Sequence, residues 1–526
     1  MLQVYDRVLA SQAIPTLVTL TVLVGVLFSL YGVIEATRSH MILRIGNLVD
    51  ERIRGRLFRI AVRARLGSTR TADPVRDGEA LRNFTSSSAV LSFFDLPWTP
   101  IYIVIVFVIH PTLGWLSIFG IVIVTLLLIA NELLSQNPAK DVYLEMGVRQ
   151  RRTDDTTENA EAVVAMGMMR AMQDRWEHAT STLRAYQNVA SDRSSSVASA
   201  SKSFRFFLQS AVLAVGAYLV IQGEMSPGSM IAASVITARA LAPIDQVVAS
   251  WKSFIGARQA WGRIAKFFQL PDSGSRETQL PLPQATLSAR GISVGSPGNG
   301  RVLLTDLNFA VKAGDGVGVV GPSGSGKTTL ARLLVGVWGP LSGDVRWDGA
   351  AMDQYDPEQV GSIVGYLPQR VELFDGTVAE NISRFQADVS SDDVIAAAKL
   401  AGAHDLVISL ADGYDSFIGE GGSLLSAGQR QRIGLARAVF GKPFLVVLDE
   451  PNSNLDGEGE QALRETILRL RAGGAVVFVI AHRPSAVEAV DYILVLNGGR
   501  QISFGEKSEI LAGNSPVVSV GAGLGR

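Results

Sequence analysis

A glycine-rich segment that ends in a lysine and two threonines offers the clearest chemistry in the sequence. It has the form G-x-x-x-x-G-K-[ST], follows the apolar run Gly316–Val320 and precedes the helix-like sequence TTLARLLVGV. In such a loop the backbone N–H groups can point at phosphate oxygens, and the start of the helix adds a partial positive charge. Lys327 would reach the β- and γ-phosphates, and the Thr328 hydroxyl would bind Mg²⁺. The predicted phosphate-binding residues are Gly321, Pro322, Ser323, Gly324, Ser325, Gly326, Lys327, Thr328 and Thr329.

Two carboxylates follow a second apolar run, FLVVLDE at Phe444–Glu450. Asp449, at the end of the predicted strand, suits Mg²⁺, either directly or through water. Glu450 is then placed to polarise an attacking water. Two surface acids at the end of a strand would give the same local pattern, but an ATP-hydrolysing phosphate loop needs such a carboxylate. The separation from Lys327 leaves room for an inserted subdomain.

The segment LSAGQ precedes another helix-like sequence, RQRIGLARAVF. Ser426 and Gln429 have the S-x-x-Q spacing of a capping box, which predicts a helix start. A helix cap alone is the simplest interpretation, but a helix start approached by small residues is also an anion site. Since the loop at 321–328 already serves the chain's own phosphates, Ser426, Ala427, Gly428 and Gln429 would serve the nucleotide of another subunit.

The strand–loop–helix order around these motifs predicts an α/β P-loop ATPase domain as their scaffold. The whole chain of 526 residues carries 48 Lys and Arg against 49 Asp and Glu, so its charge gives no argument for nucleic-acid binding, and we expect no nucleic-acid partner. It has no cysteine and five scattered histidines. Disulfides, thiolate nucleophiles and Cys-based zinc sites are therefore excluded.

The amino-terminal half is far more apolar. Charged residues make up 18% of the chain, below the roughly 25% of soluble domains, and the mean hydropathy is +0.25. Buried helices of a soluble protein are the alternative, but so many apolar runs within 250 residues are hard to hide from lipid. We therefore predict five membrane-spanning helices. The apolar runs are Thr16–Ile34, Pro100–Ile109, Leu113–Ala130, Phe206–Gln222 and Ser229–Val248.

The breaks between these runs predict tight turns. His110-Pro111 separates the second run from the third, and GEMSPG at 223–228 separates the last two. Arg239 and Asp245 make the last run polar, so it should line an aqueous path or a helix interface rather than lipid.

The distribution of basic residues predicts the orientation. Eleven arginines lie in Arg38–Arg82 and more basic residues in Lys140–Arg205, whereas the two turns carry no Lys or Arg. The positive-inside rule places the long basic segments in the cytoplasm, as helices that project beyond the bilayer, and the turns outside. Five spans put the amino end outside with only 15 residues before the first run. We therefore expect a further span upstream of Met1.

The boundary between the halves is predicted in the Pro- and Ser-containing stretch Leu270–Pro283. The expected organisation is a transmembrane domain at 1–270, a linker at 271–284 and a nucleotide-binding domain at 285–526.

Together the motifs GPSGSGKT, LSAGQRQR, FLVVLDEP, SNLD and VVFVIAH make residues 285–515 resemble the ABC-transporter nucleotide-binding domain. The resemblance implies a head-to-tail homodimer with two ATP molecules between P-loop and LSAGQ faces. It implies that Gln369 is the Q-loop glutamine, a Mg²⁺ ligand with Thr328 and Asp449, and that Asp456 is the D-loop aspartate. It also implies catalytic roles for Gln369, Glu450 and His482, the last as the switch histidine at the γ-phosphate.

Two positions depart from the family pattern. Ala427 stands where glycine is usual, so its methyl group could crowd the partner's phosphate, and Ser296 stands where an adenine-stacking aromatic is expected. The base contact expected from the family pattern is therefore weakened.

The amino-terminal half resembles the type I secretion permease/ATPases, particularly the metalloprotease/lipase exporter branch, through MLQVYDRVLASQAIPTL, DLPWTPIYIVIVFVIHPTLGW and NAEAVVAMGM. The family has six spans, of which five are visible here. The resemblance implies a multi-pass protein of the bacterial inner membrane with a cytoplasmic ATPase domain. It also implies a secreted, unfolded polypeptide as cargo, and a periplasmic adaptor (membrane fusion) protein and an outer-membrane channel as partners.

We therefore expect a homodimeric, ATP-driven polypeptide exporter. Coupling helices near Asn83–Phe94 and Asn159–Met168 would transmit motion between its domains. An exporter of lipid, peptide or drug would carry the same ATPase motifs and is the nearest alternative. An ATP-gated membrane protein without turnover is a second alternative, against which Glu450 and His482 argue.

Overall fold

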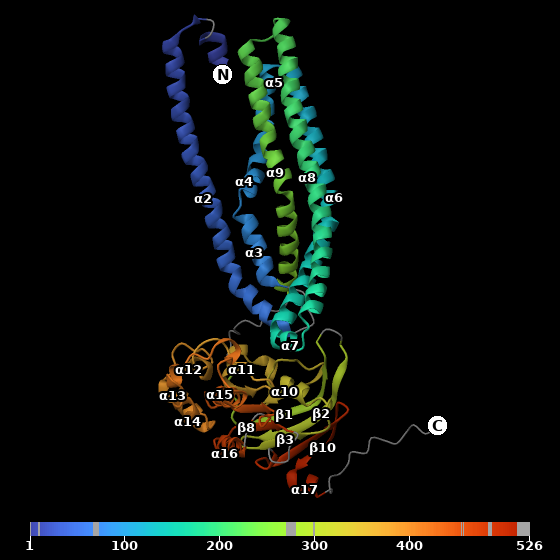
Figure 1. Cartoon of the computed structure of the whole chain (residues 1–526), viewed down its shortest axis with the longest axis vertical. Coiled ribbons are helices and arrows are strands. Elements are labelled where there is room, and N and C mark those ends of the chain that lie inside the picture. Colours follow the sequence, from blue (N-terminus) through green and yellow to red (C-terminus); the bar gives the residue numbers. More distant parts are fainter. Residues whose placement is uncertain are drawn as a thin grey trace, which may run out of the picture. The chain divides into compact units, whose positions relative to one another are not determined.

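A computed structural model describes most of the chain (Figure 1). Contacts divide it into two compact units, the first formed by residues 1–65 and 69–270 and the second mainly by 271–526. The described residues are 2–8, 11–66, 73–269, 280–297, 300–453, 455, 457–481 and 487–512, without the side chains of 131, 132, 134–139, 194 and 511.

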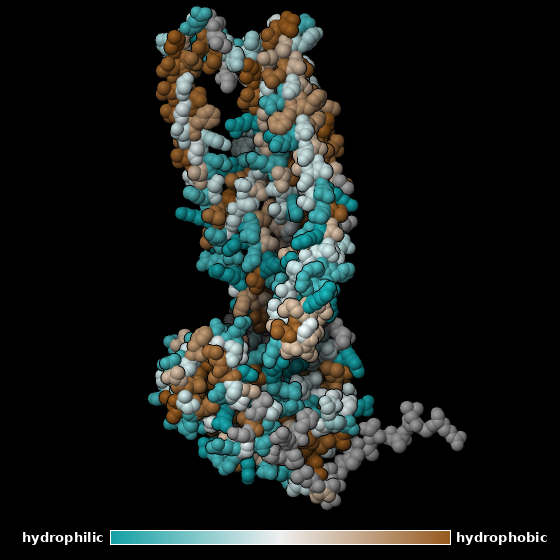
Figure 2. All heavy atoms as spheres, viewed as in Figure 1, coloured by the Kyte–Doolittle hydropathy of each residue, from teal (hydrophilic) through white to brown (hydrophobic). Residues whose placement is uncertain are grey.

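The described residues of the first unit form helices and the turns between them, and five of the helical segments are long and apolar enough to cross a membrane. These segments match the five predicted runs, which confirms that expectation. In the helical unit of Figure 2, hydrophobic side chains cover much of the upper half, and hydrophilic side chains become frequent farther down. The helices are α2 (Ile14–Leu66), α3 (Pro74–Thr85), α4 (Ser88–Asp95), α5 (Thr99–Ile109), α6 (Pro111–Glu158), α7 (Ala160–Ala165), α8 (Met169–Ile221) and α9 (Pro227–Phe268), preceded by η1 (Val4–Val8).

The long helices extend well past the thickness of a bilayer. Helices α2 and α8 each have 53 residues, or about 80 Å at 1.5 Å per residue, against a hydrocarbon core of about 30 Å. The predicted extensions are therefore present. The basic residues lie on the parts of these helices beyond the apolar runs.

Both predicted turns occur where proline begins a new helix. His110 is the N-cap of α6, with an extended backbone, and its side chain accepts a hydrogen bond from the Thr112 N–H; Pro111 follows at the first helical position. Ser226 caps α9 in the same way, before Pro227. Proline fits there because the first helical N–H has no partner within the helix. A hydrogen bond of 3.2 Å between the His110 ring and the Glu224 carboxylate joins the two turns.

The segment from Pro74 to Ile109 corrects one expectation. Helices α3, α4 and α5, with the 3₁₀ turn η2 (Leu96–Trp98) between the last two, all pack against α9 (Figure 1). Ser88–Ile109 is one of the five candidate spans. The prediction of a coupling helix near Asn83–Phe94 is therefore wrong, because this stretch contains a break between α3 and α4 within one run of helices rather than a turn at its end.

Helix α9 holds the first unit together. It contacts α3, α4, α5, α6 and α8. In its most apolar stretch 44% of the residues are buried, the largest share among the five candidate spans. Two small apolar clusters lie along it, one containing Val212 and Ala233 and the other Leu208 and Leu241.

The second unit contains one sheet in the order β5-β4-β1-β2-β10-β9-β3-β8-β7-β6. Strands β6, β7, β8, β3 and β9 are parallel to their neighbours in that order, so their carboxyl ends meet at one edge. The strands are β1 (Thr286–Gly295), β2 (Val302–Lys312), β3 (Gly316–Val320), β4 (Ser342–Trp347), β5 (Ala350–Ala351), β6 (Val364–Leu367), β7 (Leu445–Asp449), β8 (Val476–Ile480), β9 (Tyr492–Asn497) and β10 (Arg500–Glu506).

Two apolar cores lie against this sheet, which is the predicted α/β scaffold with an additional antiparallel part. One core contains Trp347 and Phe478, and the other joins the helices after β6 to the sheet through Ile433 and Leu448. The helices of this unit are α10 (Lys327–Leu334), α11 (Pro357–Ile363), α12 (Val378–Ile382), α13 (Ser391–Leu400), α14 (His404–Ile408), α15 (Ala427–Val439), α16 (Gly457–Ala472) and α17 (Lys507–Leu511).

Candidate functional site

The glycine-rich loop connects β3 to α10, as the sequence predicts. Gly321, Gly324 and Gly326 all have positive φ angles, which glycine adopts without steric cost. A Cβ at Gly321 would lie 2.1 Å from the carbonyl oxygen of Leu496, and one at Gly326 would lie 2.4 Å from Leu304. These two glycines are therefore required both by backbone conformation and by space.

Lys327 begins α10 and turns its side chain back onto the loop. Its Nζ donates hydrogen bonds to the carbonyl oxygens of Gly321 (2.8 Å) and Pro322 (3.0 Å), and the residue is only 6% exposed. Burial lowers the pKa of Lys327, against the opposing effect of Glu450 and Asp449. The ammonium group is thus held inside the loop, where an anionic ligand would offset the energetic cost of burying its positive charge.

Asp449 is fully buried at the end of β7, and neither carboxylate oxygen accepts a hydrogen bond of normal geometry from the described residues. Burial raises the pKa of Asp449, although Thr328, Arg332 and Lys327 oppose that shift. A buried carboxylate that lacks donors and lies near the Thr328 hydroxyl fits Mg²⁺, which takes one or two carboxylates together with phosphate oxygens and water.

Gln369 and Glu450 meet at the same edge of the sheet. The Gln369 side-chain amide donates a hydrogen bond of 2.9 Å to the Glu450 carboxylate. Gln369 follows β6, whereas Glu450 follows the neighbouring strand β7. Glu450 has a φ of 51°, and its backbone N–H donates to the Ile480 carbonyl (2.9 Å). This unusual backbone conformation turns the chain directly after Asp449.

The capping box at the start of α15 is confirmed. The Ser426 hydroxyl accepts a hydrogen bond from the Gln429 N–H (3.2 Å), and the Gln429 side chain accepts one from the Ser426 N–H (2.8 Å). Ser426 and Ala427 are exposed. Among the described residues, no hydrogen bond or ion pair joins this helix start to the loop at 321–329.

The remaining predicted positions divide into two groups. Asp456 and His482 lie outside the described residues. Ser296 is described, and its backbone N–H donates to the Arg301 carbonyl (2.8 Å).

The sequence analysis did not identify Gln431 as part of the site. It is 2% exposed, and its side-chain amide donates to the Pro451 carbonyl (2.7 Å) directly after Glu450. Gln431 therefore links α15 to the carboxylate segment. The position of Gln431, two residues after the capping box, could have indicated that it lies on the buried face of the helix. The sequence could not have indicated that its partner is the Pro451 carbonyl.

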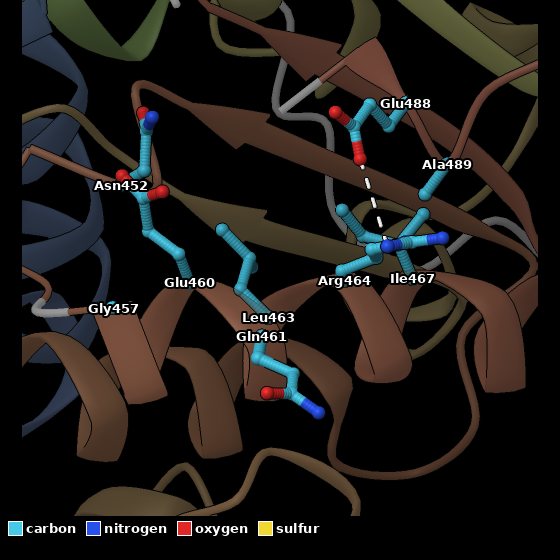
Figure 3. Close-up of a pocket in the computed structure, with 9 residues that line it drawn as sticks. All are labelled: Asn452, Gly457, Glu460, Gln461, Leu463, Arg464, Ile467, Glu488 and Ala489. Atoms are coloured by element: carbon cyan, nitrogen blue, oxygen red, sulfur yellow. Dashed lines mark ion pairs between the residues drawn. The ribbon is translucent and has the colours of Figure 1, made fainter. Parts of the chain in front are cut away.

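A pocket of about 250 Å³ lies beside α16 (Figure 3). Glu460 lies near Asn452 on one side of it, and the ion pair between Arg464 and Glu488 lies on the other. None of the residues 321–329 lines it. This pocket is therefore distinct from the predicted phosphate site.

Comparisons with known proteins match both units. The ABC transporter transmembrane region model matches residues 3–243, and the ABC transporter model matches residues 304–453. A solved structure of a bacterial Atm1-family ABC exporter with ATP bound has the same fold, with a TM-score of 0.81 and 24% sequence identity over 96% of this chain and 91% of that chain.

Curated relatives extend over nearly the whole chain. The type I secretion system ATP-binding protein PrsD of Rhizobium meliloti is 46% identical over 514 residues, which cover 97% of this chain and 88% of PrsD. The alpha-hemolysin translocation ATP-binding protein HlyB of Escherichia coli is 29% identical over 533 residues, which cover 97% of this chain and 73% of HlyB. With both ABC models matched and this identity to PrsD, the chain belongs to the type I secretion system ATP-binding proteins of the ABC transporter family.

Proposed function

We propose that this protein uses ATP hydrolysis to export an unfolded polypeptide across the bacterial inner membrane, as one component of a type I secretion system. The observation that carries the ATPase part is the meeting of Lys327, Asp449, Glu450 and Gln369 at one edge of a sheet, in a chain that also has five candidate membrane spans. The likeness to PrsD and to HlyB, whose name describes the translocation of alpha-hemolysin, supports the polypeptide cargo.

Each site residue has a distinct role in this proposal. Lys327 and the loop N–H groups hold the phosphates, and Thr328, Asp449 and Gln369 hold Mg²⁺, which supplies charge neutralisation during phosphoryl transfer. Glu450 orients and polarises the attacking water, and Gln369 positions the Glu450 carboxylate through their hydrogen bond. His482 and Asp456 take the γ-phosphate and dimer contacts that the family resemblance implies.

The active form in this proposal is a homodimer. The exposed start of α15 presents its first N–H groups without a phosphate of its own, and the partner's glycine-rich loop would supply one. Ala427 keeps its backbone N–H for this contact. Residues 1–270 act as the transmembrane domain, 271–284 as the linker and 285–526 as the nucleotide-binding domain. A periplasmic adaptor protein and an outer-membrane channel continue the path.

Helix α7 is the proposed coupling element. It is a short helix between the long helices α6 and α8, and its neighbourhood exposes Val164 and Met166, each 66% accessible. An exposed apolar surface on a turn between two long helices is a candidate interaction surface. This keeps the second of the two coupling positions expected from the sequence.

The function can be tested with a stalled cargo. A candidate polypeptide is fused to a domain that folds too fast to be exported, expressed with the transporter, its adaptor and its outer-membrane channel, and crosslinked. Mass spectrometry should then identify the polypeptide attached to the helical unit, in a manner that depends on ATP.

The Lys327→Ala variant is the matched control, because it keeps the helical unit and removes a phosphate contact. Crosslinking of the cargo should disappear in that variant. ATP-dependent movement of a lipid or small molecule, with no polypeptide trapped under any condition, would instead support the alternative exporter.

A further inference from the structure

Arg239 is a charged residue deep in a candidate membrane span. It lies 12 residues after Pro227, the first residue of α9, or about 18 Å along the helix axis, close to the middle of a hydrocarbon core of about 30 Å. An arginine side chain is too short to reach the aqueous interface from this depth. Arg239 is nevertheless exposed, and in the described part of the chain no acidic side chain pairs with it.

The neighbouring polar side chains of α9 do have partners. Thr237 shares a hydrogen bond with Ser117 of α6 (3.0 Å), and Gln246 accepts one from Ser92 of α4 (2.7 Å). Asp245 accepts a hydrogen bond from Ser201 of α8 (2.9 Å) and pairs with Arg205 of the same helix (3.1 Å). These three side chains therefore connect α9 to other helices, whereas Arg239 makes no such connection to an acidic side chain in the described part of the chain.

The helix face around Arg239 is not built for lipid. The positions three, four and seven residues away hold Ala232, Val235, Ile236, Ala242, Pro243 and Gln246, of which Val235 and Gln246 are exposed. The exposed upper part of α2 instead carries large apolar residues such as Val22, Leu23, Val26, Leu27 and Phe28. Ionisable residues inside membranes face water-filled cavities or other protein rather than lipid tails.

We propose that Arg239 lines the translocation path and binds carboxylates of the transported polypeptide. The inference rests on the proposed function and names a chemical feature of its cargo. A guanidinium has five N–H donors in a planar fork that matches a carboxylate, and it stays charged at every physiological pH. Aspartate and glutamate side chains of an unfolded cargo would provide the negative charge that this part of α9 lacks.

The position of Arg239 is tested by single-cysteine labelling. Because the native chain has no cysteine, Arg239→Cys introduces the only thiol. A charged, membrane-impermeant thiol reagent should modify this variant in membranes. The matched control is Val26→Cys, which lies 12 residues after Ile14, the first residue of α2, and should stay unmodified in lipid.

Failure of the reagent to reach Arg239→Cys would overturn the proposal. A disulfide between two copies of Arg239→Cys, without modification by the reagent, would overturn it too, because the partner's α9 would then occupy this face.

The chemistry is tested with two unfolded reporter cargoes that differ only by exchange of Asp and Glu for Asn and Gln. The Arg239→Glu variant should export the acidic cargo roughly tenfold more slowly than the native chain, and Arg239→Lys should restore much of that loss. The uncharged cargo and the basal ATPase rate should change little.

Equal export of the acidic cargo by Arg239→Glu and the native chain would overturn the role of Arg239. If the native chain exported neither cargo, the proposed function would fail instead. The two failures are therefore distinguishable.

Discussion

In the nucleotide-binding unit the chemically important side chains gather at one edge of a sheet, whereas in the helical unit they are spread along one helix. Asp449 ends β7, Glu450 follows it, and Gln369 follows the neighbouring parallel strand β6 and donates to Glu450. Both carboxylates act on the pKa of Lys327. Along α9, by contrast, single polar groups such as Thr237 and Asp245 each bind a different helix.

The two arrangements follow from different solvents. A water-soluble domain can concentrate charge at a sheet edge because water and ligands satisfy it. A helix in lipid has no water to hydrogen-bond its polar groups, so each one needs a protein partner or an aqueous path. Changes at the sheet edge should therefore impair chemistry with little effect on folding, and changes at the paired polar groups of α9 should mainly affect helix packing.

The largest expected effect tests this contrast in the nucleotide-binding unit. Glu450→Gln should lower steady-state ATP hydrolysis by roughly 10²–10⁴-fold, because it removes the proposed general base. ATP binding and the thermal unfolding temperature should stay near native values. Turnover is measured in nanodiscs, with the exposed Glu465→Gln as the control. Turnover above about a tenth of the native rate would contradict the role of Glu450.

The counterpart in the helical unit is Arg263, which pairs with the buried Asp77 of α3 (2.7 Å). Arg263→Ala leaves that carboxylate buried and unpaired, which should lower stability by about 3–5 kcal/mol. Thermal unfolding in detergent provides the measurement. Arg469→Ala, in an exposed pair with Glu465, should change stability by less than about 0.5 kcal/mol. Equal effects of the two variants would show that the ion pair of α9 is not structural.

A smaller effect is expected for ligand binding. Lys327→Ala removes a charge-assisted contact worth about 1.5–3 kcal/mol, so the dissociation constant for ATP should rise roughly ten- to a hundredfold. Equilibrium binding of a fluorescent ATP analogue measures it, with the exposed Lys312→Ala as the control. An unchanged dissociation constant would remove Lys327 from the phosphate site.

Mixing two inactive variants tests whether the start of α15 serves a partner chain. Lys327→Ala and Ser426→Arg should each be inactive alone, because each proposed homodimer would have both sites broken. A heterodimer would have one site intact and the other doubly broken, so hydrolysis should reappear only in the mixture. No recovery would contradict the shared site, provided that a tandem-linked dimer with a single Lys327→Ala change is active.

The smallest effect concerns the pH dependence of stability. Burial raises the pKa of Asp449 above its ordinary value of 3.8, so ionisation of Asp449 destabilises the nucleotide-free fold. The stability that the protonated Asp449 carboxyl group contributes is fully present below pH 3.8. That stability is lost as the pH rises through the raised pKa. Asp449→Asn should therefore unfold at a higher temperature than the native chain near neutral pH, and the difference should shrink on acidification. A difference that grows on acidification would contradict this explanation.

Local patterns were enough to predict a large part of the molecule. The apolar runs predicted all five candidate spans, and His110-Pro111 predicted a turn that proline enforces by its own geometry. The capping box at Ser426 and Gln429 was predictable because its two hydrogen bonds involve residues only three positions apart. Glycine spacing likewise predicted the loop between β3 and α10.

Other features depended on residues that are distant in sequence. Gln369 meets Glu450 across 81 positions because β6 and β7 are neighbours in the sheet, and Arg263 meets Asp77 across 186 positions because α9 packs against α3. The coupling position near Asn83–Phe94 was wrong for the same reason, since hydropathy does not reveal that α3, α4 and α5 all pack against α9. The sequence by itself determined the elements and their local turns, which depend on backbone geometry and on the separation of apolar from polar residues. The tertiary structure decided which polar groups meet, because a buried polar group takes its partner from whichever element packs beside it.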